Sequence, residues 1–325
     1  PAIREHFDIV FFDQRGTGPS HGLQCVEASN EQWLRSWTPD DIDRMLANEE
    51  AYVAACIAEF ADTEILPFVG TEQAARDLEL FRQAIGAPTL WIFGVSYGTY
   101  IGQVYAHLYP GAVEALILDG VMDTAVATAE DGPMGAAVGE DLLRRMETAC
   151  LENDTCGYAF SRGPIEAYDR LMARLEKEPI AVMFPRSNGT LVERELTDEM
   201  LFGNLAFTIY GPFYRTGFLH ALAAAEYGDY LPLLRTAYQW LEIDGDTMQP
   251  ISASGTPYGT YWGAFFAISC RDAFVRPADP RAAARVAYER AAADRDRFPH
   301  FSRMSVGLEA SCAFWPALAD AVEPL

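Results

Sequence analysis

Long apolar runs are missing from this chain. Among its 325 residues no apolar run reaches the roughly 18 residues that a transmembrane helix needs. No stretch has the pattern of a signal peptide, and the chain opens at Pro1 rather than at methionine. We therefore expect no membrane partner, and we expect that a segment upstream of Pro1 has been removed or left out.

Basic residues are also scarce. The chain has 24 Lys and Arg against 47 Asp and Glu, which gives a formal net charge of −23 at pH 7. So acidic a surface repels phosphate backbones and anionic lipids, which argues against nucleic acid as a partner. The charge suits a cationic substrate, such as the free ammonium of a peptide. It equally suits solubility or a salty medium.

Motifs for cofactors and metals are lacking too. Gly16 and Gly18 form a Gly-x-Gly pair, but no third glycine follows at the dinucleotide spacing. No Cys-x-x-Cys pair occurs among the six cysteines. We predict no cofactor and no metal.

The six cysteines are even in number, which is typical of disulfides and an oxidising compartment. We therefore predict a secreted, extracellular protein, with six free buried thiols in a cytosolic protein as the alternative. Sequence alone leaves the connectivity open. Pairing between neighbours along the chain predicts the bridges Cys25–Cys56, Cys150–Cys156 and Cys270–Cys312.

The turn from Gly94 to Gly98 carries the strongest chemical signal. A Gly-x-Ser-x-Gly turn between an apolar strand-like run and a helix-like stretch that ends before Pro110 is typical of a nucleophile elbow. We predict that Ser96 is a nucleophile and that the flanking glycines leave room for its strained turn. The backbone N–H of Tyr97, at the helix start, would stabilise an oxyanion. The alternative is an ordinary turn.

The first part of the chain alternates strands and helices, as parallel α/β sheets do. Thr71 is expected to cap a helix that Gly86 closes. Buried strands are expected at 7–12, 90–93 and 115–119, and helices at 40–60 and 71–85.

The pattern changes after residue 124. Helices are predicted at 135–152 and 164–177, and a β-hairpin at 180–196 around the Asn188-Gly189 turn signal. From 198 to about 297 the chain is mostly helical, interrupted by a Gly/Ser/Pro loop at 244–259. We expect a helical insertion above the sheet that shapes a pocket and excludes water.

Several motifs in combination resemble secreted actinobacterial tripeptidyl aminopeptidases, which are α/β-hydrolases related to proline iminopeptidases. The matching segments are Asp13-Gln-Arg-Gly-Thr-Gly-Pro-Ser20, Gly94–Gly102, Leu116–Gly120, Ala267–Asp272 and Cys312–Pro316. The resemblance covers nearly the whole chain. It implies an α/β fold with a parallel-sheet core, incomplete in this chain, and a large, mostly helical cap. The expected division is core at 1–124, cap at 125–315 and a return toward the core at 316–325.

The same resemblance implies a serine exopeptidase that releases tripeptides or shorter pieces from free peptide N-termini through an acyl-enzyme on Ser96. It makes Asp272 a partly buried candidate for holding the substrate ammonium, with a structural ion pair as the alternative. Other readings remain open: a proline iminopeptidase, a hydrolase of small esters or amides, or a non-catalytic binding module of the same fold.

Parts of the family's machinery are absent from this sequence. Members of the family have a Gly-rich loop before the first strand seen here, which supplies a second oxyanion N–H, and an acid and a histidine after the cap. None of the five histidines lies after a late core strand, and only His300 is kept as a candidate substitute base. We expect a fragment whose core a second chain or a C-terminal segment completes, with an open sheet edge beside 7–12 or 90–93.

Overall fold

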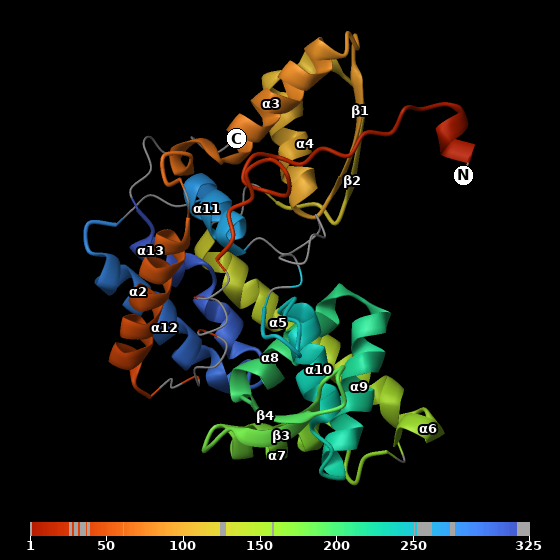
Figure 1. Ribbon diagram of the computed structural model, residues 1–325, viewed down its shortest axis with the longest axis vertical. Coiled ribbons are helices and arrows are strands. Elements are labelled where there is room, and N and C mark those ends of the chain that lie inside the picture. The colour runs from red at the N-terminus through yellow and green to blue at the C-terminus, as the bar shows by residue number, and fades with distance from the viewer. Residues whose placement is uncertain are drawn as a thin grey trace.

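The computed structural model describes residues 2–25, 28, 32, 37, 40–60, 62–123, 128–157, 159–249, 251, 262–273 and 277–316. Figure 1 shows a small sheet with two helices at one end of the molecule and a body of helices with a hairpin at the other. The expected loop at 244–259 and the return at 316–325 lie largely outside the described residues. In the part that is described, no helix is long and apolar enough to cross a membrane.

The sheet consists of β1 (Leu90–Val95) and β2 (Val113–Asp119), which pair in parallel. The chain returns between them through α4 (Tyr97–Leu108), and α3 (Thr71–Ala84) lies beside α4 on the same face of the sheet (Figure 1). Ala75, Val104, Tyr105 and Ala112 form the buried core between them. These predicted elements are confirmed, although Gly70 rather than Thr71 is the N-cap residue of α3.

The predicted strand at 7–12 is wrong. These residues run without strand pairing, and Phe11 is 90 % exposed. The ring of Phe7 lies 5.2 Å from that of Trp91, so the segment passes β1 without joining the sheet. An apolar run becomes a buried strand only where neighbouring strands supply hydrogen-bond partners. The described chain supplies none here.

The outer face of the sheet is more exposed than the apolar strands predict. Phe93 and Ile117 are 67 % and 53 % exposed, because α3 and α4 cover only the opposite face. Within the described chain β1 pairs with β2 alone, so the open edge expected beside 90–93 is present.

The helical body holds the largest hydrophobic cluster of the described residues. The predicted hairpin is confirmed: Ile180 pairs with Leu196, and Gly189 adopts a φ of +82° in the turn. The elements of this body are α5 (Thr128–Leu151), α6 (Asp154–Gly157), α7 (Pro164–Leu175), β3 (Ile180–Pro185), β4 (Leu191–Leu196), α8 (Asp198–Ala206), α9 (Pro212–Glu226) and α10 (Leu231–Trp240).

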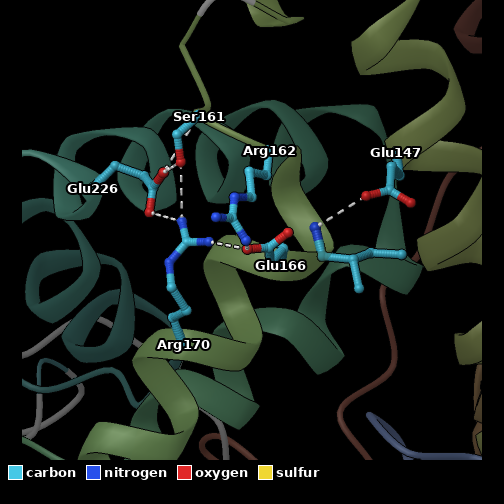
Figure 2. A network of polar contacts seen from close by, with 7 residues as sticks. Glu147, Ser161, Arg162, Glu166, Arg170 and Glu226 are labelled. Carbon is cyan, nitrogen blue, oxygen red and sulfur yellow. Dashed lines mark hydrogen bonds and ion pairs between the residues drawn. The ribbon is translucent and has the colours of Figure 1, made fainter.

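A polar network joins α7 to the end of α9 on the surface of this body (Figure 2). Arg170 donates to Glu166 at 2.7 Å and to Glu226 at 2.5 Å, and the Ser161 hydroxyl donates to Glu226 at 2.9 Å. Arg162 also pairs with Glu166, at 3.0 Å. The network lines a pocket of about 580 Å³ in which both guanidinium groups already have carboxylate partners. We interpret the network as structural, because its ion pairs hold α7 against the end of α9.

One helix near the N-terminus and three consecutive helices near the end of the described chain pack as a third unit. They are α2 (Ile42–Glu59), α11 (Trp262–Ala273), α12 (Pro280–Ala293) and α13 (Glu309–Phe314). Although α2 falls within the segment predicted as core, it packs against α12 and α13 instead of the sheet. Short 3-10 helices occupy Ala2–Glu5, Leu66–Phe68, Pro110–Ala112, Phe207–Tyr210, Asp294–Asp296 and Ser302–Val306.

All three predicted disulfides are present. Cys25–Cys56 ties the N-terminal segment to α2, and Cys270–Cys312 ties α11 to α13. Cys150–Cys156 closes the short loop between α5 and α6. The bridges thus link helices to one another, or to the N-terminal segment, where no strand pairing joins them.

Candidate active site

Ser96 occupies a strained turn between β1 and α4. Its backbone has φ 52° and ψ −122°, a conformation that costs free energy for any residue with a side chain. The Ser96 amide donates to the carbonyl of Asp119 at the end of β2, at 2.9 Å. Ser96 is also the N-cap residue of α4, yet its side chain makes no capping bond. The helix therefore leaves the Ser96 hydroxyl unused.

The two glycines of the elbow have different roles. A Cβ on Gly94 would lie 2.4 Å from the carbonyl oxygen of Gly98, so only glycine fits there. A Cβ on Gly98 would meet no described atom within 4 Å. A Cβ on Gly102 would lie 2.9 Å from a Leu116 methyl, which shows how closely α4 lies on β2. The expectation that both elbow glycines must lack bulk is thus borne out sterically for Gly94 alone.

The loop after β2 is bonded to the elbow helix. The buried Thr99 hydroxyl donates to the Ser96 carbonyl at 2.6 Å and accepts from the Met122 amide at 2.9 Å. Gln103 donates to the Met122 carbonyl at 3.0 Å. The elbow and the end of β2 therefore form one hydrogen-bonded unit.

Tyr97 is the first residue of α4, so its N–H has no helical carbonyl to donate to and points out of the helix start. Such an N–H, at the positive end of the helix dipole, is suited to an anion. The Tyr97 side chain runs inward. Its hydroxyl lies 2.5 Å from the Thr71 hydroxyl, and burial raises the pKa of the Tyr97 phenol.

Asp272 lies on α11, and the structure connects it to the elbow through Thr71. The Thr71 amide donates to both carboxylate oxygens, at 3.0 Å each, and the Thr71 hydroxyl donates to Oδ2. Burial raises the pKa of Asp272 to about 6, although the bonds from Thr71 oppose that shift. Asp272 is half-buried, as predicted, and supplies the cap that Gly70 cannot give to α3.

The turn that follows residue 12 lies beside Tyr97 and the start of α3. Arg15 donates to both carboxylate oxygens of Asp77 on α3, at 2.6 and 2.5 Å, and to the carbonyl of Phe68 at 3.0 Å. Gln14 is buried, and its side chain acts to lower the pKa of the Tyr97 phenol, against the effect of burial. Sequence reasoning missed Gln14 and the second role of Thr71. No local signal marked Gln14, because Asp13, Arg15 and Thr17 in the same turn are polar as well.

His300 does not serve the elbow. Its Nδ1 contacts Glu140 of α5 at 3.1 Å, and its Nε2 contacts Asp169 of α7 at 3.1 Å. Burial lowers the pKa of His300, but the two carboxylates outweigh burial and raise it to about 9. His300 is therefore a charged brace within the helical body. No hydrogen bond joins a histidine to Ser96 among the described residues.

No group of three or more His, Cys, Asp or Glu side chains that could hold a metal ion occurs in the described part of the chain. The chemistry that the elbow itself supports is nucleophilic. It combines an unused serine hydroxyl on a strained turn, an adjacent free N–H and a helix start.

The sequence that folds into this strand, strained serine turn and helix matches, over residues 1–246, a family model described as the alpha/beta hydrolase fold. The chain belongs to this family. The parallel pair β1–β2 with α3 and α4 is the part of that fold which the structure describes.

Among known proteins, this alpha/beta hydrolase is distantly similar to serine peptidases and to an esterase. It is 32 % identical over 160 residues to the serine protease Hip1 of Mycobacterium tuberculosis, covering 47 % of this chain and 31 % of Hip1. It is 34 % identical over 124 residues to a tripeptidyl aminopeptidase of Streptomyces lividans, covering 36 % and 22 %. It is 26 % identical over 325 residues to carboxylesterase B of M. tuberculosis, covering 98 % and 59 %.

The chain thus spans between about a fifth and three fifths of the length of these relatives. The resemblance to tripeptidyl aminopeptidases is confirmed as distant, partial homology. The similarity to both peptidases and an esterase leaves the substrate undetermined.

Proposed function

We propose that this protein is a serine hydrolase that acts through an acyl-enzyme on Ser96. The Ser96 oxygen attacks a substrate carbonyl and passes its proton to a general base. The Tyr97 N–H and a second N–H stabilise the oxyanion that forms. The intermediate expels an amine or alcohol, which takes the proton, and water then hydrolyses the Ser96 ester.

The observation that carries this proposal is the backbone of Ser96. A non-glycine residue at φ 52° and ψ −122° persists only where the surrounding structure imposes it, and such residues cluster at active sites. Here the strain presents a hydroxyl that caps no helix and accompanies a free N–H at the next residue. An ordinary turn gains nothing from that arrangement.

We propose that the substrate is a peptide with a free N-terminus, from which a tripeptide or a shorter piece is released. The distant homology to an aminopeptidase and the net charge of −23 support this choice. Asp272 is the residue that the family resemblance assigns to the substrate ammonium, but both of its carboxylate oxygens already accept hydrogen bonds from Thr71, which favours the structural alternative. A proline iminopeptidase, a hydrolase of small esters and a non-catalytic module remain the alternatives; carboxylesterase B as a relative favours the ester hydrolase.

We further propose that additional polypeptide, in a longer chain or a second chain, completes the sheet and supplies the acid and histidine. The unpaired edge of β1 and its exposed apolar face support this within the described residues. Three disulfides favour an oxidising, extracellular location.

Chromogenic substrates test the reaction and its class. The full-length protein is assayed with Ala-Ala-Pro and Pro linked to p-nitroaniline and with an acyl p-nitrophenyl ester, beside Ser96→Ala and the exposed control Ser187→Ala. We expect Ser96→Ala to lose at least about 10³-fold in kcat, and Ser187→Ala to match the wild type. Full activity in Ser96→Ala would refute the proposal. Turnover of the ester alone would support the hypothesis of a small-ester hydrolase. A wild-type protein that hydrolyses none of the three substrates would favour the non-catalytic module.

A further inference from the structure

We propose that Tyr97, Thr71 and Asp272 form a hydrogen-bond chain that positions the nucleophile elbow, so that Asp272 acts on catalysis through Tyr97. Tyr97 and Asp272 are then positioning residues for Ser96. The inference rests on the proposed function, because it assumes that Ser96 is the nucleophile.

The direction of the chain follows from its donors. The Thr71 hydroxyl has one proton, which it donates to Oδ2 of Asp272. The Tyr97 hydroxyl, 2.5 Å from the Thr71 oxygen, must therefore be the donor of that bond. The Thr71 hydroxyl thus donates once and accepts once, and the carboxylate of Asp272, which only accepts, fixes the order.

The chain connects segments that no strand pairing joins. Asp272 and Thr71 are 201 residues apart in sequence, and Thr71 and Tyr97 are 26 apart. At the far end α11 is anchored by the Cys270–Cys312 disulfide, two residues before Asp272. Around the carboxylate the backbone is close: a Cβ on Gly70 would lie 2.6 Å from Asp272 Oδ1. The acceptor at the end of the chain has little room to move.

The near end of the chain lies next to the reacting group. Tyr97 follows Ser96 directly, and the peptide between them carries the N–H to which the proposed function assigns the oxyanion. Fixing the Tyr97 side chain therefore fixes the orientation of that peptide and of the Ser96 carbonyl, which Thr99 holds from the other side. A displacement of about 1 Å in such a group can lower a rate by about 100-fold.

Because the Tyr97 phenol is buried, it needs the hydrogen bond to Thr71. A buried phenol without a hydrogen-bond partner is costly, so its partners define where the ring can sit. Other charged or titratable groups that interact with Asp272 are Arg271 on α11, Glu72 on α3 and Tyr100 on α4. Among the described residues none of these hydrogen-bonds the Tyr97 or Thr71 hydroxyl, which leaves Thr71 as the link from Asp272 to the elbow.

Three substitutions break the chain at different links: Tyr97→Phe, Thr71→Val and Asp272→Asn. We expect each to lower kcat by about 10- to 100-fold with little change in KM. Thr71→Ser restores the hydroxyl and is expected to recover most of the rate. Tyr100→Phe removes a hydroxyl from the same helix that makes no hydrogen bond with the described residues, and is expected to stay within about twofold of wild type.

The experiment measures kcat and KM of these variants in the full-length protein with two substrates, an aminoacyl p-nitroanilide with a free amine and an N-acylated p-nitrophenyl ester. A positioning role lowers kcat for both substrates. If Asp272→Asn raises KM for the free amine only and leaves the ester unaffected, Asp272 binds the ammonium and the inference is wrong. Wild-type kcat in Tyr97→Phe and Thr71→Val would also overturn it.

The proposed function is tested separately by Ser96→Ala in the same assay. Loss of activity in Ser96→Ala together with unchanged kcat in the three chain variants would reject the positioning role alone. Unchanged activity in Ser96→Ala would reject both. Melting temperatures of the folded variants, measured alongside, identify any loss of rate that comes from unfolding.

Discussion

The backbone conformation of Ser96 determines which residue can occupy position 94 of the elbow. Its positive φ requires a turn so tight that the carbonyl of Gly98 lies where a side chain of residue 94 would point. Gly94 is thereby fixed by the strain at Ser96. Gly98 faces open space among the described residues, so it is not held by the same contact.

Gly94→Ala and Gly98→Ala form a matched pair at this scale. Gly94→Ala forces the turn apart, because its Cβ would meet the Gly98 oxygen at 2.4 Å. We expect it to lower the melting temperature by several degrees, as about 2 kcal/mol of strain would. Gly98→Ala is expected to leave the melting temperature within about one degree. Calorimetry measures both, and equal effects of the two changes would contradict the steric account.

At the scale of elements, His300 joins α5, α7 and the segment that leads to α13. Its two ring nitrogens contact Glu140 and Asp169, and the Tyr168 ring lies 5.9 Å away. Because both contacts are with carboxylates, the imidazolium is favoured over the neutral ring. The brace is therefore expected to depend on pH.

His300→Gln tests this brace. The pKa of His300 is raised from 6.5 to about 9, so the folded state holds its proton where the unfolded chain has released it. The stabilisation is fully present below pH 6.5 and is lost as pH rises through about 9. We expect His300→Gln to lower the free energy of unfolding by about 1–3 kcal/mol at pH 6 and by less at pH 9.5. Denaturant titrations at both pH values measure the difference.

The exposed histidine of α9 provides the control for that comparison. His220→Gln is expected to change the free energy of unfolding by less than about 0.5 kcal/mol at either pH. A loss in His300→Gln that stays constant from pH 6 to 9.5 would mean that the contacts of His300 do not depend on its charge.

At the scale of the whole molecule, the sheet has one covered and one open face. Phe93 and Ile117 project from the open face, and Phe7 rests on Trp91 beside them. Contiguous apolar surface of this kind promotes association. This is the surface on which we propose that further polypeptide completes the core.

Phe93→Thr with Ile117→Thr tests the apolar character of the open face. Threonine keeps the preference for strand conformation while removing apolar surface. In the 325-residue chain we expect the pair of changes to reduce binding of a hydrophobic dye severalfold and to leave the melting temperature nearly unchanged. Phe213→Thr, an exposed aromatic change on α9, is the control. Undiminished dye binding in the double variant would show that this face is covered.

Sequence predicted what depends on neighbours along the chain. The elbow and the hairpin turn at Gly189 follow from local spacing, and the structure contains both. The sequence left the disulfide connectivity open, and the structure contains the pairing of neighbouring cysteines that was predicted. Prediction from the sequence failed where contacts with residues distant in the chain determine the structure. Residues 7–12 have the pattern of a strand, but no described strand pairs with them. Helix α2 packs against helices more than 200 residues away in sequence. The bond from Thr71 to Asp272 has no local signature either.

Covalent labelling of the nucleophile tests the central claim most directly. The full-length protein is treated with a fluorophosphonate, digested and mapped by mass spectrometry, with Ser96→Ala in parallel. The account predicts one phosphonyl adduct, on the Ser96 hydroxyl, and none in Ser96→Ala. An adduct on another serine, or an unlabelled Ser96 in a protein that still hydrolyses its substrate, would contradict it.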